Sequence, residues 1–172
     1  MGGYTGSRIP NTYIIDIDQD KVMRGPDMNI GRQWPACQKM VIGTKIYLVA
    51  TGGANPAVAN PADGYRLDST EFLEVDLLYD GSEINWDKDY QAEGIKWTDN
   101  GPKLPKALYA TRAISLSNSI YTMGGQTPDV TYSTNIFKLT CIGTIDSCSW
   151  NEIDSQTQVK KLGCNMVGST IS

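Results

Sequence analysis

The sequence predicts an all-β fold, and three observations support this prediction. Short runs of β-branched and aromatic residues, which fit a pleated and half-buried surface, recur along the chain. Two of these runs, Ile46–Thr51 and Ile120–Met123, end abruptly in glycine pairs at 52–53 and 124–125. A third glycine pair stands at 2–3. Since a glycine pair lets the backbone turn through positive φ, three of them indicate a repeated structural unit.

Each of the later glycine pairs follows a predicted β-hairpin. The first strands are Cys37–Ile42 and Thr111–Leu116, and short polar turns separate them from the second strands. Arg32 and Lys106 precede these hairpins at the same distance from the tyrosine of each second strand. Polar residues between two strand-like runs are the usual chemistry of a hairpin turn.

Two further strands are predicted after each glycine pair. The third strand has an aromatic residue near its middle: Thr12–Ile17 with Tyr13, Thr70–Leu77 with Phe72, and Thr134–Thr140 with Phe137. The fourth strand is short and carries a large apolar residue: Met23, Trp97 or Trp150. Each unit therefore contains four strands, two on either side of the glycine pair.

This order of hairpin, glycine pair, aromatic residue and tryptophan, with a basic residue ahead, resembles the kelch repeat. Kelch repeats form the four-stranded antiparallel blades of β-propellers. The resemblance implies one β-propeller domain over 1–172, with a partial blade in 1–30, blades in 31–100 and 101–156, and the start of another in 157–172. Met23 in place of tryptophan and the long loops of the second unit depart from the pattern. A closed ring needs more blades, so we expect a fragment of a longer polypeptide; the alternative fold is an unrelated β-sandwich with repeated turns.

Composition limits the function classes. The chain has 172 residues and a net charge of -4, so no basic stripe is present to bind nucleic acid. No run of 18 apolar residues exists that could span a membrane. Histidine is absent, which removes the commonest general base and metal ligand, and no Cys-x-x-Cys motif offers a zinc site. We therefore predict no enzyme activity, no metal and no cofactor.

Asp16, Asp18 and Asp20 have the spacing of the first ligands in a calcium loop. Lys21 stands where such a loop requires glycine, and Asp27 where it requires glutamate. The pattern therefore favours a solvated hairpin turn over a calcium site.

The four cysteines bear on the cellular compartment. Cys141 and Cys148 flank a short turn at the matching ends of two predicted strands, where cross-strand neighbours are close enough for a disulfide. We expect them to be bonded, which indicates an extracellular or secreted protein; two reduced cysteines are the alternative, and fit a cytoplasmic one. Cys37 and Cys164 are either buried thiols or partners of cysteines elsewhere.

Two features carry the expected binding function. The resemblance implies that the loops Tyr4–Asn11, Ala54–Ser69 and Gln126–Ser133 gather on one face. The candidate binding residues on these loops are Tyr4, Arg8, Asn55, Tyr65, Arg66, Gln126, Asp129 and Tyr132. Aromatic, arginine and amide side chains of this kind are common at recognition surfaces, although solvated loops are the alternative. The insertion Asp80–Gly94, with Trp86 and Tyr90, is either a functional loop or, as we favour, an extended hairpin that decorates one blade.

Repeated large aromatic residues are assigned to packing between blades: Phe72, Trp97, Phe137, Trp150 and Tyr13. We therefore expect a non-catalytic protein-interaction or structural module of a larger extracellular kelch-repeat protein, which binds a protein partner or assembles with other chains. The alternatives are part of a propeller enzyme similar to galactose oxidase with its catalytic residues outside this chain, an intracellular kelch adaptor with reduced cysteines, and a filament or matrix subunit.

Overall fold

The computed structural model describes residues 2–3, 7–57 and 61–153, and the expectations for Tyr4, Cys164 and 157–172 lie outside these ranges. The described chain is built from short strands. They are β1 (Thr12–Asp16), β2 (Lys21–Gly25), β3 (Ala36–Ile42), β4 (Lys45–Thr51), β5 (Thr70–Glu74), β6 (Tyr79–Asp80), β7 (Glu83–Ile84), β8 (Arg112–Leu116), β9 (Ser119–Met123), β10 (Ile136–Thr140) and β11 (Ser149–Ile153). Three single 3-10 turns connect some of them: η1 (Pro61–Asp63), η2 (Val75–Leu78) and η3 (Ile145–Ser147).

All strands pair antiparallel with their neighbours in the sequence, which confirms an all-β fold. One sheet has four strands in the order β8-β9-β10-β11, a second has three in the order β3-β4-β5, and β1-β2 and β6-β7 form two-stranded sheets. An isolated bridge between Phe72 and Thr98 adds the residue after Trp97 to the edge of β5. Nothing in the described part of the chain is a helix with the length and apolar character that a membrane crossing needs.

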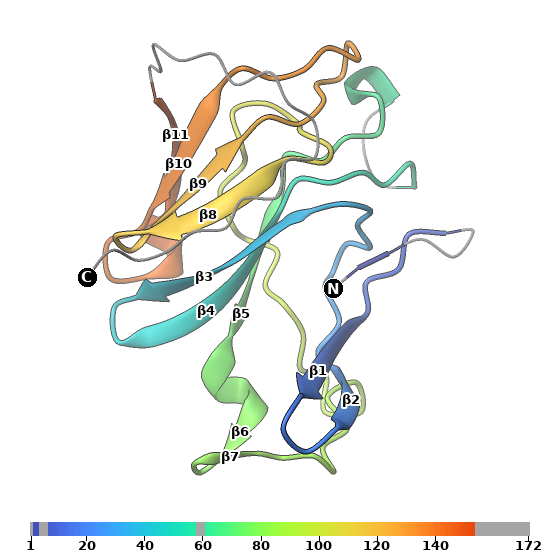
Figure 1. Ribbon diagram of the computed structural model, residues 1–172, viewed down its shortest axis with the longest axis vertical. Helices are drawn as coiled ribbons and strands as arrows, with labels where there is room; N and C mark the ends of the chain where they lie inside the picture. Colours follow the sequence, from blue (N-terminus) through green and yellow to red (C-terminus); the bar gives the residue numbers. More distant parts are fainter. Residues whose placement is uncertain (1, 4–6, 58–60, 154–172) are drawn as a thin grey trace.

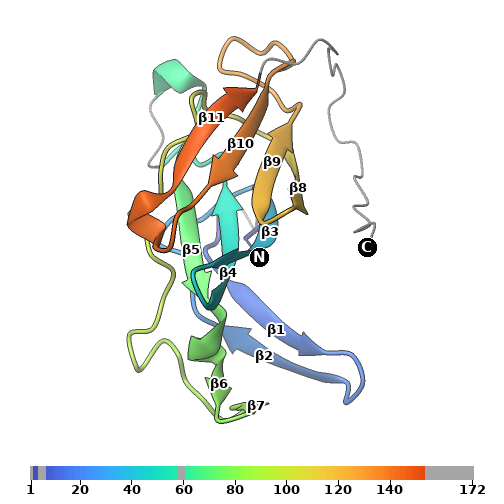
Figure 2. The same cartoon turned by 90° about the vertical axis from the view of Figure 1, so that its left-hand side faces the viewer.

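The sheet β3-β4-β5 lies in the middle of the molecule, with the sheet β8–β11 on one side of it and the β1-β2 hairpin on the other (Figures 1 and 2). Successive residues of a strand point to opposite faces of its sheet. On β5, Phe72 belongs to a buried cluster shared with β9, β10 and β11, whereas Leu73 belongs to a second cluster shared with the β1-β2 hairpin. The middle sheet is therefore buried on both faces, and the hydrophobic core consists of the two layers on either side of it.

The glycine pairs make the same connection in successive units. The amide of Gly3 donates to the carbonyl of Arg32 at 3.0 Å, and that of Gly53 donates to the carbonyl of Leu108 at 2.8 Å. Both acceptors lie in the segment that leads into the next sheet. At Gly52, φ is 65° and an added Cβ would lie 2.7 Å from the Leu108 oxygen. Glycine is required there because of both the backbone conformation and the close approach of the neighbouring chain.

These bonds correct the alignment of the two hairpins. They place Leu108, not Lys106, at the position of Arg32. β3 and β4 have seven residues each, whereas β8 and β9 have five, so equal spacing from a tyrosine does not identify equivalent residues. Lys106 is exposed and donates to Asn135, while Leu108 is fully buried.

Two predicted strands of the second unit are shorter in the structure. The third strand was expected to continue to Leu77, but β5 ends at Glu74 and Val75–Leu78 forms η2. The sequence Val-Asp-Leu-Leu is apolar at both ends and therefore resembles a strand. In the structure it forms a 3-10 turn, which places Leu78 in the core. Trp97 lies outside any strand and is followed by the single bridge at Thr98.

Trp97 and Trp150 pack between sheets, as predicted. Trp97 Nε1 donates to the carbonyl of Pro26 at 3.1 Å, and Trp150 Nε1 donates to Thr70 Oγ1 at 3.0 Å. Each acceptor belongs to the preceding unit, so each indole ties its own unit to the one before it. Phe72 and Phe137 are also fully buried between sheets.

Tyr13 does not pack between sheets, and this prediction is wrong. Its side chain is 56% exposed, because the inward face of the β1-β2 hairpin is formed by Ile14 and Met23. Tyr13 and Ile15 share the opposite face, which is exposed. In a strand where both faces are apolar, the sequence pattern does not distinguish the buried face from the exposed one.

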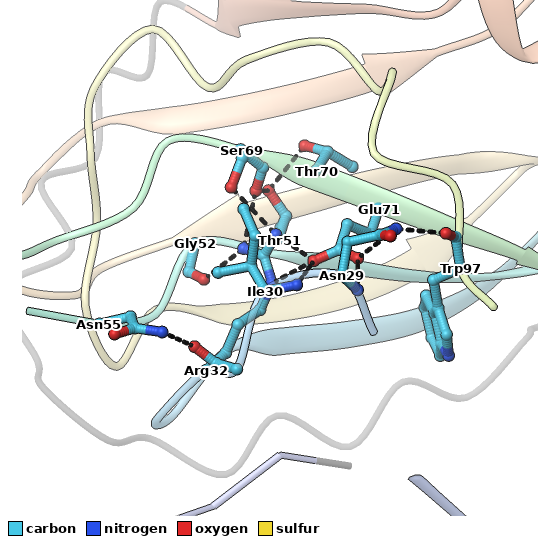
Figure 3. Close-up of polar contacts among 11 residues, drawn as sticks. Asn29, Ile30, Arg32, Thr51, Gly52, Asn55, Ser69, Thr70, Glu71 and Trp97 are labelled. Carbon is cyan, nitrogen blue, oxygen red and sulfur yellow. Dashed lines mark hydrogen bonds and ion pairs between the residues drawn. The ribbon is translucent and has the colours of Figure 1, made fainter. Parts of the chain in front are cut away.

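A buried ion pair joins β5 to the segment that leads into β3 (Figure 3). Arg32 and Glu71 are both fully buried, and Arg32 donates from Nε at 3.0 Å and Nη2 at 2.7 Å to Glu71 Oε1. The remaining donors of Arg32 reach the carbonyls of Gly52 and Ser69 and the Ser69 hydroxyl at 2.9–3.0 Å. All five N–H groups of the guanidinium thus have an acceptor.

Glu71 is satisfied equally well. Its Oε2 accepts the backbone amide of Asn29 at 2.6 Å, and its Oε1 accepts that of Ile30 at 3.2 Å. A buried charge is tolerated when it is paired and hydrogen-bonded in this way. The pair fixes the two ends of the loop between β4 and β5, because Gly52 and Ser69 flank that loop.

The insertion Asp80–Gly94 packs against the β1-β2 hairpin. It begins with the two-residue strands β6 and β7 and continues through turns. Tyr90 is fully buried and donates to the carbonyl of Leu78 at 3.0 Å, and Gln91 donates to the carbonyl of Gly25 at 2.8 Å. Trp86 remains partly exposed between two shallow hollows, with Lys21 Nζ 5.7 Å from its ring centre.

The predicted disulfide is present. Cys141 and Cys148 are bonded across the short turn that contains η3, with a Cα–Cα distance of 4.0 Å. Cys37 is a free thiol in the cluster beneath the β1-β2 hairpin. Asp16 caps its own turn, since its Oδ1 accepts the amides of Asp18 and Gln19 at 2.9 Å.

Candidate recognition face

The loops that follow the glycine pairs lie on one side of the molecule, at the right of Figure 1. Together with the segments that lead into β3 and β8 they form a surface that we call the loop face. It consists of residues 7–11, 31–35, 54–57, 61–69, 107–111 and 126–133.

Short backbone pairings join these loops to one another. Gln33 and Ala54 exchange both backbone hydrogen bonds, at 3.0 and 3.1 Å, and Tyr109 and Gln126 do the same at 2.8 and 3.1 Å. Ala54 also forms a bridge with Arg66, and Gln126 forms one with Tyr132. Since the segments that lead into β3 and β8 are each bonded to a loop that follows a glycine pair, this part of the loop face is a fixed surface and not a set of independent connections.

Three of the predicted binding residues occupy equivalent positions in successive units. The residue that follows each of them donates its amide to the second glycine of its pair: Ile9 to Gly3, Leu67 to Gly53 and Ser133 to Gly125, at 3.2, 2.9 and 2.9 Å. The residues that precede these donors, and that therefore occupy the equivalent position in each unit, are Arg8, Arg66 and Tyr132. The repeat therefore presents two arginines and a tyrosine in a row across the loop face.

The backbone of the loop face is strained at bulky residues. Outside glycine, positive φ occurs at Trp34 (52°), Tyr65 (63°), Ala110 (56°) and Val130 (65°) among the described residues of this face. The other described cases, Asp20, Ser117 and Asn118, lie in hairpin turns. A large or β-branched residue in this conformation is uncommon, and strain of this kind gathers at functional sites.

Aromatic side chains dominate the exposed part of the face. Trp34 is 56% exposed and stacks on Tyr109, with ring centres 5.1 Å apart and an angle of 19° between the planes. Tyr65 and Tyr132 are also exposed. Rigid aromatic side chains bury large areas at little entropic cost, which makes them frequent anchors in protein interfaces.

A hollow of about 160 Å³ opens where loop-face residues of the first three units meet. The residues that line it come from several loops: Arg8, Gln33, Ala54, Gly64, Tyr65, Arg66 and Tyr109. Arg66 is held at its rim, because Nη1 donates to the carbonyl of Gly64 at 2.7 Å and Nη2 donates to Gln126 Oε1 at 2.6 Å. Arg8, Tyr65, Arg66 and Gln126, all predicted from the sequence, thus come together here.

Two other predicted residues are engaged within the protein. Asn55 is buried; its Nδ2 donates to the carbonyl of Gly31 at 2.7 Å, and its Oδ1 accepts the amide of Ala57 at 2.9 Å. Asp129 accepts hydrogen bonds from the hydroxyls of Thr127 and Thr131, and these bonds lower the pKa of its carboxyl group. Asn55 and Asp129 therefore support the loop face by shaping its loops.

No protein-family model matches this chain, and no curated protein matches it either. The interpretation of the loop face consequently depends on the geometry of the described residues.

Gln33, Trp34 and Tyr109 were not among the predicted binding residues. They lie in the segments that lead into the first strands of their units, directly opposite the loops that follow the glycine pairs. The sequence signal for them is an exposed aromatic residue beside a turn, which is too common to select without the fold. Within the described ranges, no group of three or more cysteine and carboxylate side chains is arranged to hold a metal ion.

Proposed function

We propose that this chain is part of a kelch-type β-propeller, with blades over 31–100 and 101–156 between partial blades in 1–30 and 157–172. Three features support the proposal. One sheet is a four-stranded meander, and a second becomes one when the bridge at Thr98 is included. The glycine pairs bond to the next unit at equivalent places, and the indoles of Trp97 and Trp150 each reach back to the preceding unit.

We propose further that the module is not catalytic and that it recognises a protein partner through the loop face. The observation that carries this proposal is the group of Trp34, Tyr65 and Val130, three bulky residues held at positive φ on one surface. Strain persists only where the surrounding structure fixes it, and here the bonds between loops do so. The result is a preorganised aromatic and arginine-rich surface, which loses little freedom on binding. The net charge of -4 favours a protein over a nucleic acid as partner.

The bonded Cys141 and Cys148 support an extracellular or secreted location for the protein. A cytoplasmic adaptor would hold both cysteines reduced. The mass of the protein isolated from its native source, alkylated with and without prior reduction, distinguishes the two. Alkylation at both cysteines before reduction would contradict the extracellular proposal.

Partner binding is tested by cross-linking the chain in the medium or extract of its native source and identifying captured proteins by mass spectrometry. The loop-face variant carries Trp34→Ala and Tyr65→Ala. A matched control carries Ile17→Ala and Ile142→Ala, two exposed apolar residues in turns outside the loop face. We expect the wild type and the control to capture the same protein, and the loop-face variant to capture it at least tenfold less.

Binding between purified components then confirms the captured protein as a direct partner. Equal capture by both double variants would place recognition elsewhere and contradict the proposal, and so would turnover of the captured protein by the wild-type chain.

A further inference from the structure

We infer that the hollow between Arg8 and Arg66 binds a carboxylate group. This inference rests on the proposed function of the loop face and names the chemistry of its partner. The hollow has a volume of about 160 Å³. That is roughly ten times the 10–15 Å³ that a water molecule requires, so a carboxylate fits inside.

The bonding of Arg66 is incomplete in a specific way. Its two terminal nitrogens donate to the neutral oxygens of Gly64 and Gln126. Its Nε is enclosed and has no hydrogen-bond acceptor among the described residues. Arg66 also forms no ion pair with any carboxylate in the described part of the chain. An enclosed N–H without an acceptor is costly, and a guanidinium is a strong donor to an anion.

Arg32 shows how the same protein satisfies an enclosed guanidinium. It uses Nε and Nη2 to hold the carboxylate of Glu71 and gives its other donors to neutral oxygens. Arg66 has the neutral oxygens but not the carboxylate. Arg66 therefore lacks the type of group that Glu71 provides to Arg32, and the second N–H of each of its terminal nitrogens can donate to such a group.

The surroundings favour an anion as the ligand. Arg8 reaches the same hollow from the first unit, and none of the described residues that line it is acidic. The chain as a whole has a net charge of -4, so this concentration of positive charge is local. Tyr65 and Tyr109 form part of the wall and give the hollow a partly apolar lining. Sites that combine apolar walls with a few convergent polar groups are typical of ligand recognition.

The carboxylate can come from a free small acid or from a glutamate side chain of the partner. Four probes separate these sources: sodium acetate, sodium chloride at equal ionic strength, the blocked peptide acetyl-Gly-Glu-Gly-amide, and its glutamine counterpart. Binding is followed by ¹⁵N NMR of the whole chain, on the Arg66 Nε–H and the Gly64 amide. We expect saturable shifts with acetate and with the glutamate peptide, and none with chloride or with the glutamine peptide.

Variants test the assignment to these residues. Arg66→Gln is expected to weaken acetate binding at least tenfold, and Arg8→Gln tests the opposite wall if the first variant does not fold. Lys39→Gln removes the same charge from an exposed strand residue away from the hollow and is expected to bind acetate like the wild type. Acetate binding without peptide binding supports the site and identifies a free acid as its ligand.

Two results would overturn the inference: no saturable shift with acetate, or binding of acetate by Arg66→Gln and Arg8→Gln that equals binding by the wild type. Suppose that the Trp34→Ala and Tyr65→Ala variant loses protein capture but the wild type does not bind acetate. The proposed function would then be supported, and only the inference of a carboxylate site would be wrong. Acetate binding at Arg66 without protein capture would support the carboxylate site and contradict the proposed protein-binding function.

Discussion

Arg32 and Glu71 are the residues whose interaction most constrains the loop face. They are fully buried, and together they bind both ends of the loop between β4 and β5 and the segment that precedes β3. Removing one partner from such a pair leaves a charge buried without compensation, and this generally costs more than the pair contributes.

We predict that Glu71→Gln lowers the free energy of unfolding by about 3–5 kcal/mol. The matched control is Glu74→Gln on the same strand, whose ion pair with Lys45 is exposed to solvent and is expected to contribute far less. Urea unfolding of both variants measures the difference. A similar loss for Glu71→Gln and Glu74→Gln would show that the buried pair does not have this role.

Cys37 is expected to be chemically quiet despite being a free thiol. Burial raises the pKa of Cys37 above its ordinary value of 9.0, and the positive charge of Arg32 opposes this effect only in part. Because the thiolate is the reactive form, a raised pKa keeps the thiol protonated and slow to react at neutral pH.

We predict that iodoacetamide at pH 8 modifies Cys37 at least a hundredfold more slowly in the native protein than in urea. Peptide mapping by mass spectrometry follows the reaction at this residue alone. Rapid modification in the native state would mean that the cluster beneath the β1-β2 hairpin opens readily.

At the scale of the elements, the glycine pairs determine how one unit meets the next. Gly52 and Gly81 have the same φ of 65°, but their surroundings differ. A Cβ at Gly52 would lie 2.7 Å from the Leu108 carbonyl, whereas nothing lies within 4 Å of one at Gly81. The two positions therefore separate backbone strain from steric conflict with the next unit.

We predict that Gly81→Ala lowers the free energy of unfolding by about 1 kcal/mol, from strain at positive φ alone. Gly52→Ala is expected to cost at least about 2 kcal/mol more, because the Leu108 segment must move away. Thermal and urea unfolding provide the comparison. Equal effects of the two substitutions would mean that the approach of Leu108 to Gly52 is not important for stability.

The elements also show what the sequence can and cannot predict. The glycine pairs and the hairpins before them were predictable, since positive φ and polar turns leave local signals. The partner of Arg32 was not, because Glu71 is distant in the sequence and resembles any other carboxylate in a strand. Residues 75–78 resemble a strand by composition, and only the packing of Leu78 explains the 3-10 turn. Of the loop face, Arg8, Tyr65, Arg66 and Gln126 followed from the family resemblance, whereas Trp34 and Tyr109 required the fold.

At the scale of the whole molecule, the sheets of the described residues present an apolar face on either side of the stack. On the β1-β2 hairpin, Ile15 and Val22 are directly opposite each other in register and both are 64% exposed. On the outer face of β8–β11, Ile114, Tyr121 and Ile136 are only partly buried. The sheet in between, β3-β4-β5, is covered on both faces by the two buried clusters. An exposed apolar face on a sheet of this kind favours packing against another sheet.

We predict that the isolated chain associates with itself through these outer faces, with β1-β2 of one copy against β8–β11 of the next. Ile15→Lys with Val22→Lys is expected to weaken association at least tenfold, because burying each aliphatic side chain contributes about 1.5–3 kcal/mol and a tenfold change requires about 1.4 kcal/mol. Ile142→Lys is the control, since Ile142 is exposed on a turn outside both faces. Sedimentation velocity over a hundredfold range of concentration measures the effect. A wild-type chain that remains monomeric throughout, or an Ile142→Lys variant that loses association as strongly as the double variant, would contradict this arrangement.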